Sequence, residues 1–186
     1  GIGKFNLADF DSFDQANINR QYGAKIYNFK QPKLQCMINE ALSVNPYLDI
    51  NQFSNAISDN NLDSFLEDVD VVLDGLDFFQ VDMRRKLFNL AKEKGIYVIT
   101  AGPIGFSTAL LVFAPDKGMD FDQYFNIHDK MNEENKHLHF ALGLAPKPTH
   151  IRYLDFSKVD LQSKRGPSSI IACQSCASCA AAEAIK

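Results

Sequence analysis

The sequence predicts an α/β fold with a mostly parallel sheet and flanking helices. Three observations lead to this prediction. Short apolar runs recur along the first hundred residues, segments with helical periodicity separate them, and polar residues follow the ends of the runs. Strands that alternate with helices in this way are joined by right-handed crossovers, which produce a parallel sheet. Such sheets bind their ligands outside the carboxyl ends of the strands.

The first half of the chain predicts four strands and three helices in alternation. The strands are short apolar or alternating runs, at residues 4–9, 47–53, 69–74 and 96–100. The helices have apolar positions three or four residues apart, at residues 32–44, 59–67 and 81–94. Pro32 suits the start of a helix, Asn60 or Asn61 is able to cap the second helix, and Gly95 suits a helix end.

The character of the sequence changes after Gly102. We expect Ala101 and Gly102 to end the fourth strand and to begin a glycine-containing turn. Residues 116–160 form a long polar segment, and segments of that length without strong periodicity are usually functional or mobile. The remaining predicted elements are a β-rich run, two short helices and a terminal helix, at residues 103–113, 120–124, 133–142 and 168–186.

Composition is that of one ordinary domain. The chain has 186 residues, of which 46% are hydrophobic, and this is enough to bury a core. The net charge of −4, with acids and bases mixed along the chain, does not favour nucleic acid as a partner. No apolar run approaches the roughly 18 residues that span a bilayer. We expect a single domain over residues 1–186, in the reducing cytoplasm, with neither a nucleic-acid nor a membrane partner.

The stretch after the first strand carries residues suited to nucleotide binding. Asp9 ends that strand, where an acid can accept hydrogen bonds from a ribose. Arg20 follows in a polar loop, and its planar fork fits phosphate oxygens. Acids also follow the third strand, at Asp74 and Asp77, so several strand ends are expected on one edge. The alternative is strand ends with ordinary surface charges, with Asp74 as a structural cap and Lys33 as a solvated lysine.

Five short motifs occur in a fixed order along the chain. They are Asp9-Phe10-Asp11, Asn17-Ile18-Asn19-Arg20-Gln21, Gln31-Pro32-Lys33, Asn45-Pro46 and Leu73-Asp74-Gly75-Leu76-Asp77. In this order they resemble the ATP-dependent adenylyltransferases of the ThiF/MoeB and ubiquitin-activating superfamily. A weaker similarity follows in residues 101–105 and 180–186. The resemblance implies a Rossmann-like fold and the transfer of AMP to a carboxylate.

The resemblance also implies a role for each matching residue. The nucleotide-binding residues are Asp9, Asp11, Asn17, Arg20, Gln21 and Lys33. Asp9 would hold the ATP ribose, and the acid two residues later would shape the loop. Asn17, Arg20 and Lys33 would contact the triphosphate and stabilise charge that builds as pyrophosphate leaves. Asp77 would hold Mg²⁺, so ATP and Mg²⁺ are the expected cofactors, and Arg20, Lys33 and Asp77 the expected catalytic residues.

The chain also departs from the superfamily pattern. The first family strand and its Gly-x-Gly-x-x-Gly loop would lie before residue 1, since Gly1 to Gly3 run directly into the Asp9 strand and cannot open a helix. An arginine that reaches a neighbouring subunit would also lie there. The chain does not begin with Met, so we expect a fragment that by itself does not bind ATP tightly. Phe78 occupies a position that is often Asn in the family.

Cysteine is the second departure. Residues 37–172 contain no cysteine, so the expected crossover loop over 116–160 has no thiol nucleophile. Three thiols follow, at Cys173, Cys176 and Cys179. Their spacing on a helix predicts packing residues, and it leaves open redox or acyl-transfer chemistry or a metal site. A metal would need a fourth ligand. The histidines that could supply it are His128, His137, His139 and His150, which are most simply loop surface groups.

The predicted function is activation of a carboxylate as an acyl-adenylate, with release of pyrophosphate. The expected partner is a small protein or peptide with a free C-terminal carboxylate, such as a ubiquitin-like sulfur carrier, or a small acid. A homodimer is expected by resemblance, and residues 116–160 would face the substrate. One alternative is an inactive scaffold or dimerisation module of the same fold. Another is a nicotinamide or flavin oxidoreductase, in which the Asn-x-x-Arg-Gln and Asp-x-x-Asp motifs have no task.

Overall fold

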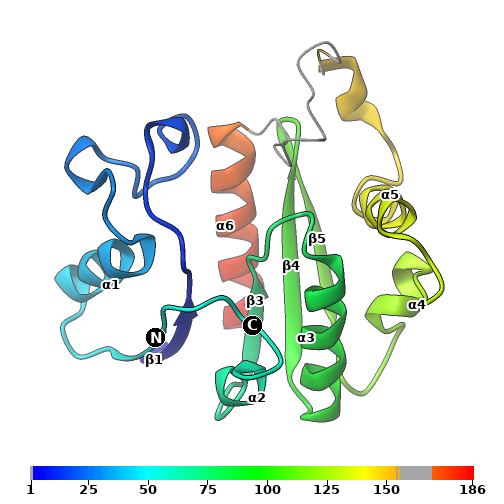
Figure 1. Ribbon diagram of the computed structural model, residues 1–186, viewed down its shortest axis with the longest axis horizontal. Helices are drawn as coiled ribbons and strands as arrows, with labels where there is room; N and C mark the ends of the chain where they lie inside the picture. Colours follow the sequence, from blue (N-terminus) through cyan, green and yellow to red (C-terminus); the bar gives the residue numbers. More distant parts are fainter. Residues whose placement is uncertain (1, 154, 156–168) are drawn as a thin grey trace. The chain divides into compact units, whose positions relative to one another are not determined.

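A computed structural model describes residues 2–153, 155 and 169–186 and confirms the α/β class (Figure 1). The chain divides into two compact units, Gly1–Val69 and Asp70–Lys186, and each is described by itself. Among the residues that the structure describes, no helix is both long and apolar enough to cross a membrane.

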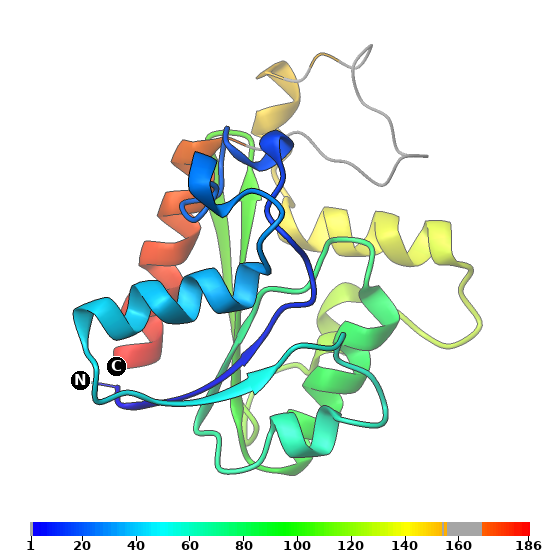
Figure 2. The same ribbon diagram turned by 60° about the vertical axis from the view of Figure 1, so that its left-hand side comes forward.

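The first unit is built on two parallel strands. β1 (Lys4–Ala8) pairs with β2 (Asp49–Phe53), with Phe5 opposite Ile50. Figure 2 shows the chain leaving β1, passing through short 3-10 turns and returning into helix α1. The remaining elements of this unit are η1 (Gln15–Asn17), η2 (Ile26–Asn28), α1 (Lys33–Val44) and α2 (Leu62–Phe65).

The loop of the first unit packs on α1 through a small buried core. Phe13 is 3% exposed, and Ile38 of α1 is 2% exposed. Gly23 is buried beside the Phe13 ring, and a Cβ at this position would meet that ring and, at 2.7 Å, the sulfur of Met37. A larger residue at Gly23 would therefore separate the loop from α1.

A three-stranded sheet forms the centre of the second unit. β3 (Val71–Asp74) pairs in parallel with β4 (Tyr97–Ile104), which pairs in antiparallel with β5 (Ser107–Phe113). The expectation that Ala101 and Gly102 form a turn is wrong, because both continue β4 opposite Leu110 and Ala109. The turn comes later, at Gly105, whose φ of +61° favours glycine.

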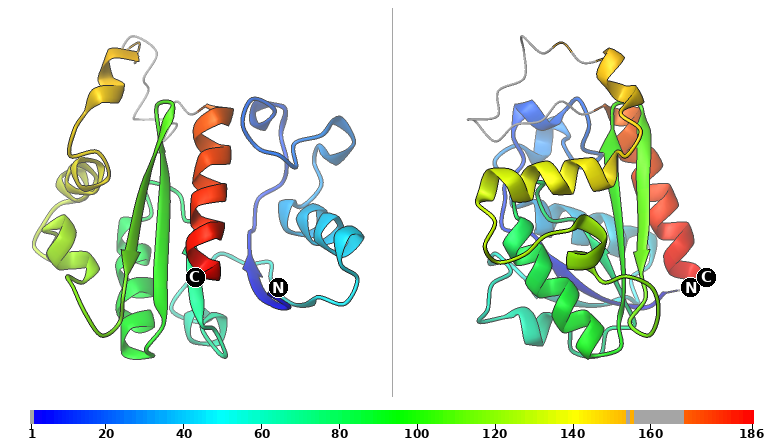
Figure 3. Two further views of the ribbon diagram at one scale, coloured as in Figure 1. Left: turned by 180° about the vertical axis from the view of Figure 1, so that it is seen from behind. Right: turned by 90° about the vertical axis from the view of Figure 1, so that its right-hand side faces the viewer.

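Helices cover both faces of this sheet. Figure 3 shows α6 (Ile170–Ile185) on one face and α3 (Val81–Glu93) on the other. α4 (Phe121–Phe125), α5 (Glu133–Leu144) and the 3-10 turn η3 (Thr149–Tyr153) occupy the part of residues 116–160 that the structure describes. The two weak helical signals in that segment therefore correspond to real helices.

The core of the second unit is rich in phenylalanine. Phe121 of α4 is 1% exposed, and its ring lies 4.7 Å from that of Phe88 and 4.6 Å from that of Phe125. Phe140 of α5 lies 4.9 Å from Phe125, which joins the two short helices. Edge-on and tilted aromatic pairs of this kind stabilise a core beyond the area they bury.

Helix ends agree with the sequence prediction at one place and differ at another. Gly95 follows α3 with a φ of +77°, as expected for a residue that ends a helix. Asn61 stands immediately before α2, but its side chain accepts from the backbone N–H of Ser58 at 2.8 Å and makes no cap bond to the helix. The prediction of a side-chain cap there is wrong, because the preceding turn uses the amide oxygen.

Candidate functional site

Three predicted nucleotide-binding residues lie together after β1. The backbone N–H of Asp11 donates to a carboxylate oxygen of Asp9 at 2.9 Å. The ammonium of Lys33 lies 2.9 Å from the Asp11 carboxylate, and only 12% of the lysine side chain is exposed. A backbone bond from Lys33 to the carbonyl of Asp11, at 2.8 Å, fixes the start of α1 beside the loop. Lys33 is therefore held in place rather than freely solvated.

The Asn-x-x-Arg-Gln motif forms the turn η1 and its exit. The side chains of Asp14 and Asn17 cap this turn reciprocally, each accepting from a backbone N–H at 2.9 Å. Arg20 donates from one nitrogen to the carbonyl of Ala16 at 3.0 Å and to Asn19 at 2.9 Å. The side-chain oxygen of Asn17 is therefore used to cap η1. The Arg20 guanidinium points back toward its own turn.

Gln21 follows the same turn. Its backbone N–H donates to the carbonyl of Asn17 at 2.9 Å, and its side chain is half-buried. Asn17 thus organises both ends of η1. No ion pair between residues that the structure describes involves Arg20.

Asp77 lies in the second unit, in the loop between β3 and α3. Its side chain is exposed, and one carboxylate oxygen accepts from the backbone N–H of Phe79 at 3.0 Å. Its carbonyl accepts from the N–H of Gln80, also in the turn that begins α3. The second carboxylate oxygen has no hydrogen-bond partner among the described residues. An exposed carboxylate on a short ordered turn suits a cation that keeps most of its water.

Asp74 ends β3 and is a structural residue, as the alternative interpretation held. Its carboxylate is 0% exposed and pairs with Arg84 Nε at 2.7 Å. The same carboxylate accepts from the Thr100 hydroxyl at 2.7 Å and from the N–H of Leu76 at 3.1 Å. Groups of the protein itself donate all of these hydrogen bonds, and the side chain is buried. The Asp74 carboxylate is therefore not accessible to a ligand.

The sequence analysis did not single out Arg84. This residue lies on the same face of α3 as Leu87, Phe88 and Ala91, which are all buried. When a charged residue occupies the apolar face of a helix, its side chain is expected to pair with a buried polar group. Arg84 is 3% exposed and donates to the carbonyls of Leu76 and, at 3.3 Å, Asp77. It therefore supports the loop that carries the predicted metal residue.

Phe78, which follows Asp77 directly, is a packing residue. Its ring lies 5.1 Å from Phe79 and 5.4 Å from Phe140 of α5. His137 of α5 has its Nε2 3.1 Å from the carbonyl of Phe79. The loop after β3 is consequently anchored on α5, and His137 is a packing partner rather than a loop surface group.

The three cysteines of α6 differ in exposure. Cys176 is 7% exposed, with its sulfur 3.5 Å from the Thr108 hydroxyl, whereas Cys179 is exposed and Cys173 is intermediate. Burial raises the pKa of the Cys176 thiol. No group of three potential metal ligands occurs within the described ranges. Packing accounts for Cys176.

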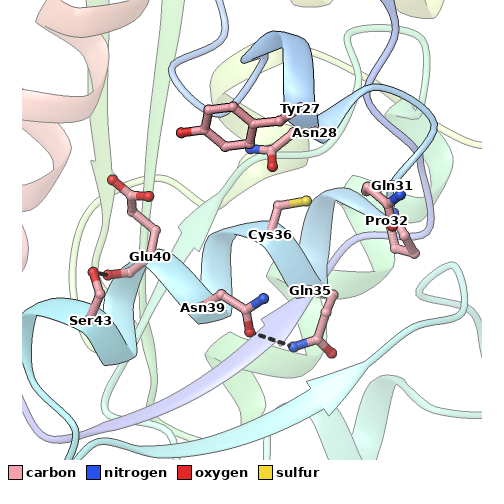
Figure 4. A pocket seen from close by; sticks show the side chains of 9 residues that line it. All are labelled: Tyr27, Asn28, Gln31, Pro32, Gln35, Cys36, Asn39, Glu40 and Ser43. Atoms are coloured by element: carbon pink, nitrogen blue, oxygen red, sulfur yellow. Dashed lines mark hydrogen bonds between the residues drawn. The ribbon is translucent and has the colours of Figure 1, made fainter.

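A cleft of about 320 Å³ lies in the first unit, between α1 and η2 (Figure 4). Gln35 and Asn39 of α1 line it and are joined by a hydrogen bond of 2.9 Å, and Tyr27 forms part of its wall. None of the residues predicted to bind nucleotide or metal lines this cleft. It is polar and open, and nothing in its lining resembles a phosphate site.

The ThiF family matches residues 1–186, and the chain therefore belongs to the ThiF family. The protein MT1398 of Mycobacterium tuberculosis (strain CDC 1551 / Oshkosh), which is uncharacterized, is 27% identical over 99 residues. Those residues are 53% of this chain and 13% of MT1398.

Solved structures share the fold at low identity. Escherichia coli MccB in complex with MccA is 19% identical and has a TM-score of 0.66, covering 100% of this chain and 48% of MccB. PaaA is 17% identical with a TM-score of 0.64, covering 97% of this chain and 55% of PaaA. The E. coli tRNA N6-threonylcarbamoyladenosine dehydratase TcdA is 18% identical and has a TM-score of 0.59. The match covers 100% of this chain and 77% of TcdA. The chain spans about half the length of MccB and PaaA.

Proposed function

We propose that the protein is an ATP-dependent adenylyltransferase that activates a carboxylate as an acyl-adenylate. Membership of the ThiF family supports this function, and so do the related structures of MccB solved with ATP and with AMPCPP. The observation that carries the proposal is the cluster of Asp9, Asp11 and Lys33 at the carboxyl end of β1. That is the end of a parallel strand where α/β folds bind nucleotides.

Lys33 has the geometry of a phosphate-binding residue. Its stem is packed and its ammonium is held by one carboxylate, so two of its three N–H donors can turn to a phosphate. We assign Asp9 to the ribose hydroxyls, and Asn17, Arg20 and Lys33 to the triphosphate. Asn17 would use its amide N–H donors, because its oxygen caps η1. Gln21 and Asp11 would hold the loop in shape.

Asp77 is assigned to the metal. Mg²⁺ is usually bound by one or two carboxylates together with phosphate and water, and Asp77 presents one exposed carboxylate. When bound, Mg²⁺ neutralises charge on the phosphate oxygens. The chain residues then position the triphosphate and offset the charge of the leaving group.

The reaction is an in-line displacement at the α-phosphorus of ATP. An oxygen of the acceptor carboxylate forms a bond to this phosphorus, and the bond from the phosphorus to the oxygen bridging to the β-phosphate breaks. That oxygen leaves as part of pyrophosphate. The products are an acyl-adenylate and pyrophosphate, and no proton transfer is required.

The acceptor is proposed as the C-terminal carboxylate of a peptide or small protein. MccB, which was solved with MccA, supports a partner of this class. We further propose a homodimer, and we propose that residues 116–160, which include α4 and α5, form the crossover or substrate-facing segment. The long polar character of this segment supports that assignment.

Pyrophosphate–ATP exchange by the full-length protein tests the proposal. A panel of carboxylate acceptors, including ubiquitin-like proteins, is added in turn. We expect acceptor-dependent exchange that Arg20→Ala and Asp77→Ala abolish. Lys4→Ala and Asp70→Ala are matched controls, because Lys4 is exposed at the start of β1 and Asp70 is exposed immediately before β3.

The rival function is a non-catalytic scaffold with the same fold. The packing of the half-buried Phe78 ring on Phe140 of α5, in place of a polar group, is the observation that favours it. Absence of exchange with every acceptor, together with no calorimetric binding of Mg·ATP, would support the scaffold. Mg·ATP binding without exchange would show that the acceptor panel lacks the substrate.

A further inference from the structure

Arg84 is placed to control the loop that carries Asp77. We propose that Arg84 is a positioning residue for Asp77, acting through the backbone of residues 76–77 to set the direction of the carboxylate and the affinity of the site for a divalent cation. The inference rests on the proposed function, in which Asp77 holds Mg²⁺.

One guanidinium connects the end of β3 with the loop. Arg84 Nε donates to the buried Asp74 carboxylate at 2.7 Å. Its two terminal nitrogens donate to the carbonyls of Leu76 and Asp77. The three acceptors lie on residues 74–77, so the guanidinium fixes this segment along its length. An arginine has five donors in a rigid fork, and it can serve several acceptors at once.

Hydrogen bonds within the loop restrain its backbone only in part. Gly75 is exposed, and a Cβ built there would meet nothing within 4 Å. Glycine is the residue with the greatest backbone freedom in the unfolded chain, so the loop costs more entropy to order. Asp77 contributes the turn made by its own carboxylate and the N–H of Phe79. Anchors from α3 are therefore needed to hold the carboxylate in one direction.

Helix α5 holds Arg84 from the other side. The guanidinium carbon lies 4.6 Å from the centre of the Phe140 ring, in a cation–π contact with a residue that is 2% exposed. His137, one turn earlier in α5, contacts the carbonyl of Phe79. Arg84 therefore has its rotamer fixed by packing, which is what a positioning residue requires.

The plain alternative is that Arg84 only neutralises Asp74 in the core. Thr100 separates the two roles, because its hydroxyl donates to the Asp74 carboxylate at 2.7 Å but makes no bond to residues 75–77. Thr100→Val removes one hydrogen bond to the buried Asp74 carboxylate. It leaves in place the bonds from Arg84 to the two loop carbonyls. Arg84→Lys keeps the positive charge for Asp74 but cannot reproduce the fork that reaches both carbonyls.

The test measures Mn²⁺ binding to the full-length protein by electron paramagnetic resonance, with a nonhydrolysable ATP analogue present. We expect Arg84→Lys to raise the dissociation constant for Mn²⁺ about 10- to 100-fold, the usual effect of losing a residue that orients a metal ligand. Thr100→Val should leave this constant unchanged, although both variants lower the free energy of unfolding. Asp77→Ala should abolish binding.

Phe140→Leu keeps the assay decisive if Arg84→Lys does not fold. It removes the ring beneath the guanidinium and retains the ion pair, so a smaller rise in the Mn²⁺ dissociation constant is expected. If wild type, Phe140→Leu and Arg84→Lys had the same Mn²⁺ dissociation constant, the positioning role of Arg84 would be overturned and the proposed metal site would stand. The same conclusion would follow if Arg84→Lys and Thr100→Val weakened Mn²⁺ binding equally. Wild-type protein without Asp77-dependent Mn²⁺ binding would overturn the proposed metal site, and the role of Arg84 with it.

Discussion

The carboxylate of Asp74 and the guanidinium of Arg84 form an ion pair of 2.7 Å, with 0% and 3% of their side chains exposed. A buried ion pair contributes little net stability, because the loss of hydration offsets the attraction. Removing one partner is costly, since it leaves a charge without water or a counterion. The pair therefore constrains which substitutions the centre of the second unit tolerates.

Arg84→Met should lower the free energy of unfolding by about 3–5 kcal/mol, because it leaves the Asp74 carboxylate buried and unpaired. The double variant Asp74→Asn with Arg84→Met should lose less than Arg84→Met alone, since no buried charge remains. Urea denaturation measures both. Arg85→Met is the control on the same helix, because its partners Asp122 and Asp129 keep access to water. A double variant as unstable as Arg84→Met would contradict this account.

Lys33→Met should reduce pyrophosphate exchange about 100- to 1,000-fold, the usual cost of losing one group that stabilises transition-state charge. Its effect on the free energy of unfolding should stay below about 1 kcal/mol, because the partner Asp11 is 54% exposed. Exchange kinetics and urea denaturation of the same preparations separate these effects. Lys30→Met, at an exposed lysine three residues earlier, should retain wild-type exchange. Parallel losses in both variants would argue against phosphate binding by Lys33.

The cysteines of α6 should react with a thiol reagent in the order of their exposure. Cys179 should be modified first and Cys176 last, because burial blocks access and raises the pKa of the Cys176 thiol. Mass spectrometry of peptides after timed labelling gives the order, and labelling in urea should remove the difference. Fast labelling of Cys176 in the folded protein would point to a reactive thiol rather than a packing residue.

Asp82 and Lys136 predict a pH dependence for the second unit. A hydrogen bond from Lys136, at 2.7 Å, lowers the pKa of the Asp82 carboxyl below its ordinary value of 3.8. A lowered pKa in the folded state means that the stabilisation is fully present above that ordinary value and is lost as the pH falls toward the lower one. Urea midpoints of wild type and Asp82→Asn should differ at neutral pH and converge in acid. A constant difference down to the lowest pH would contradict the pairing.

The sequence predicted the alternation of strands and helices well, because apolar periodicity is local. The strand 69–74, the helix 81–94 and the residue that ends it, Gly95, all match the structure within a few residues. The turn expected at Ala101 was wrong, because antiparallel pairing with β5 extends β4 to Ile104. Such pairing depends on residues that follow later in the chain, and local patterns do not reveal it.

The candidate site could be predicted only where side-chain identity is sufficient. The order of five motifs indicated the family and named Asp9, Lys33 and Asp77, and their nucleotide and metal roles stay predictions. The sequence could not show that Asp14 and Asn17 cap one turn, or that Phe78 packs on α5. These contacts depend on the path of the backbone between elements.

The sequence alone determined the α/β class and the positions of most elements, because both follow from local patterns, and its ordered motifs indicated the ThiF family. Tertiary structure decided that Asp74, the last residue of β3, is enclosed by protein donors, while Asp77, three residues later, remains exposed. The physical reason is the burial of Arg84. A buried guanidinium needs a buried counterion, and Asp74 supplies it for Arg84. The Asp77 carboxylate is left exposed to solvent.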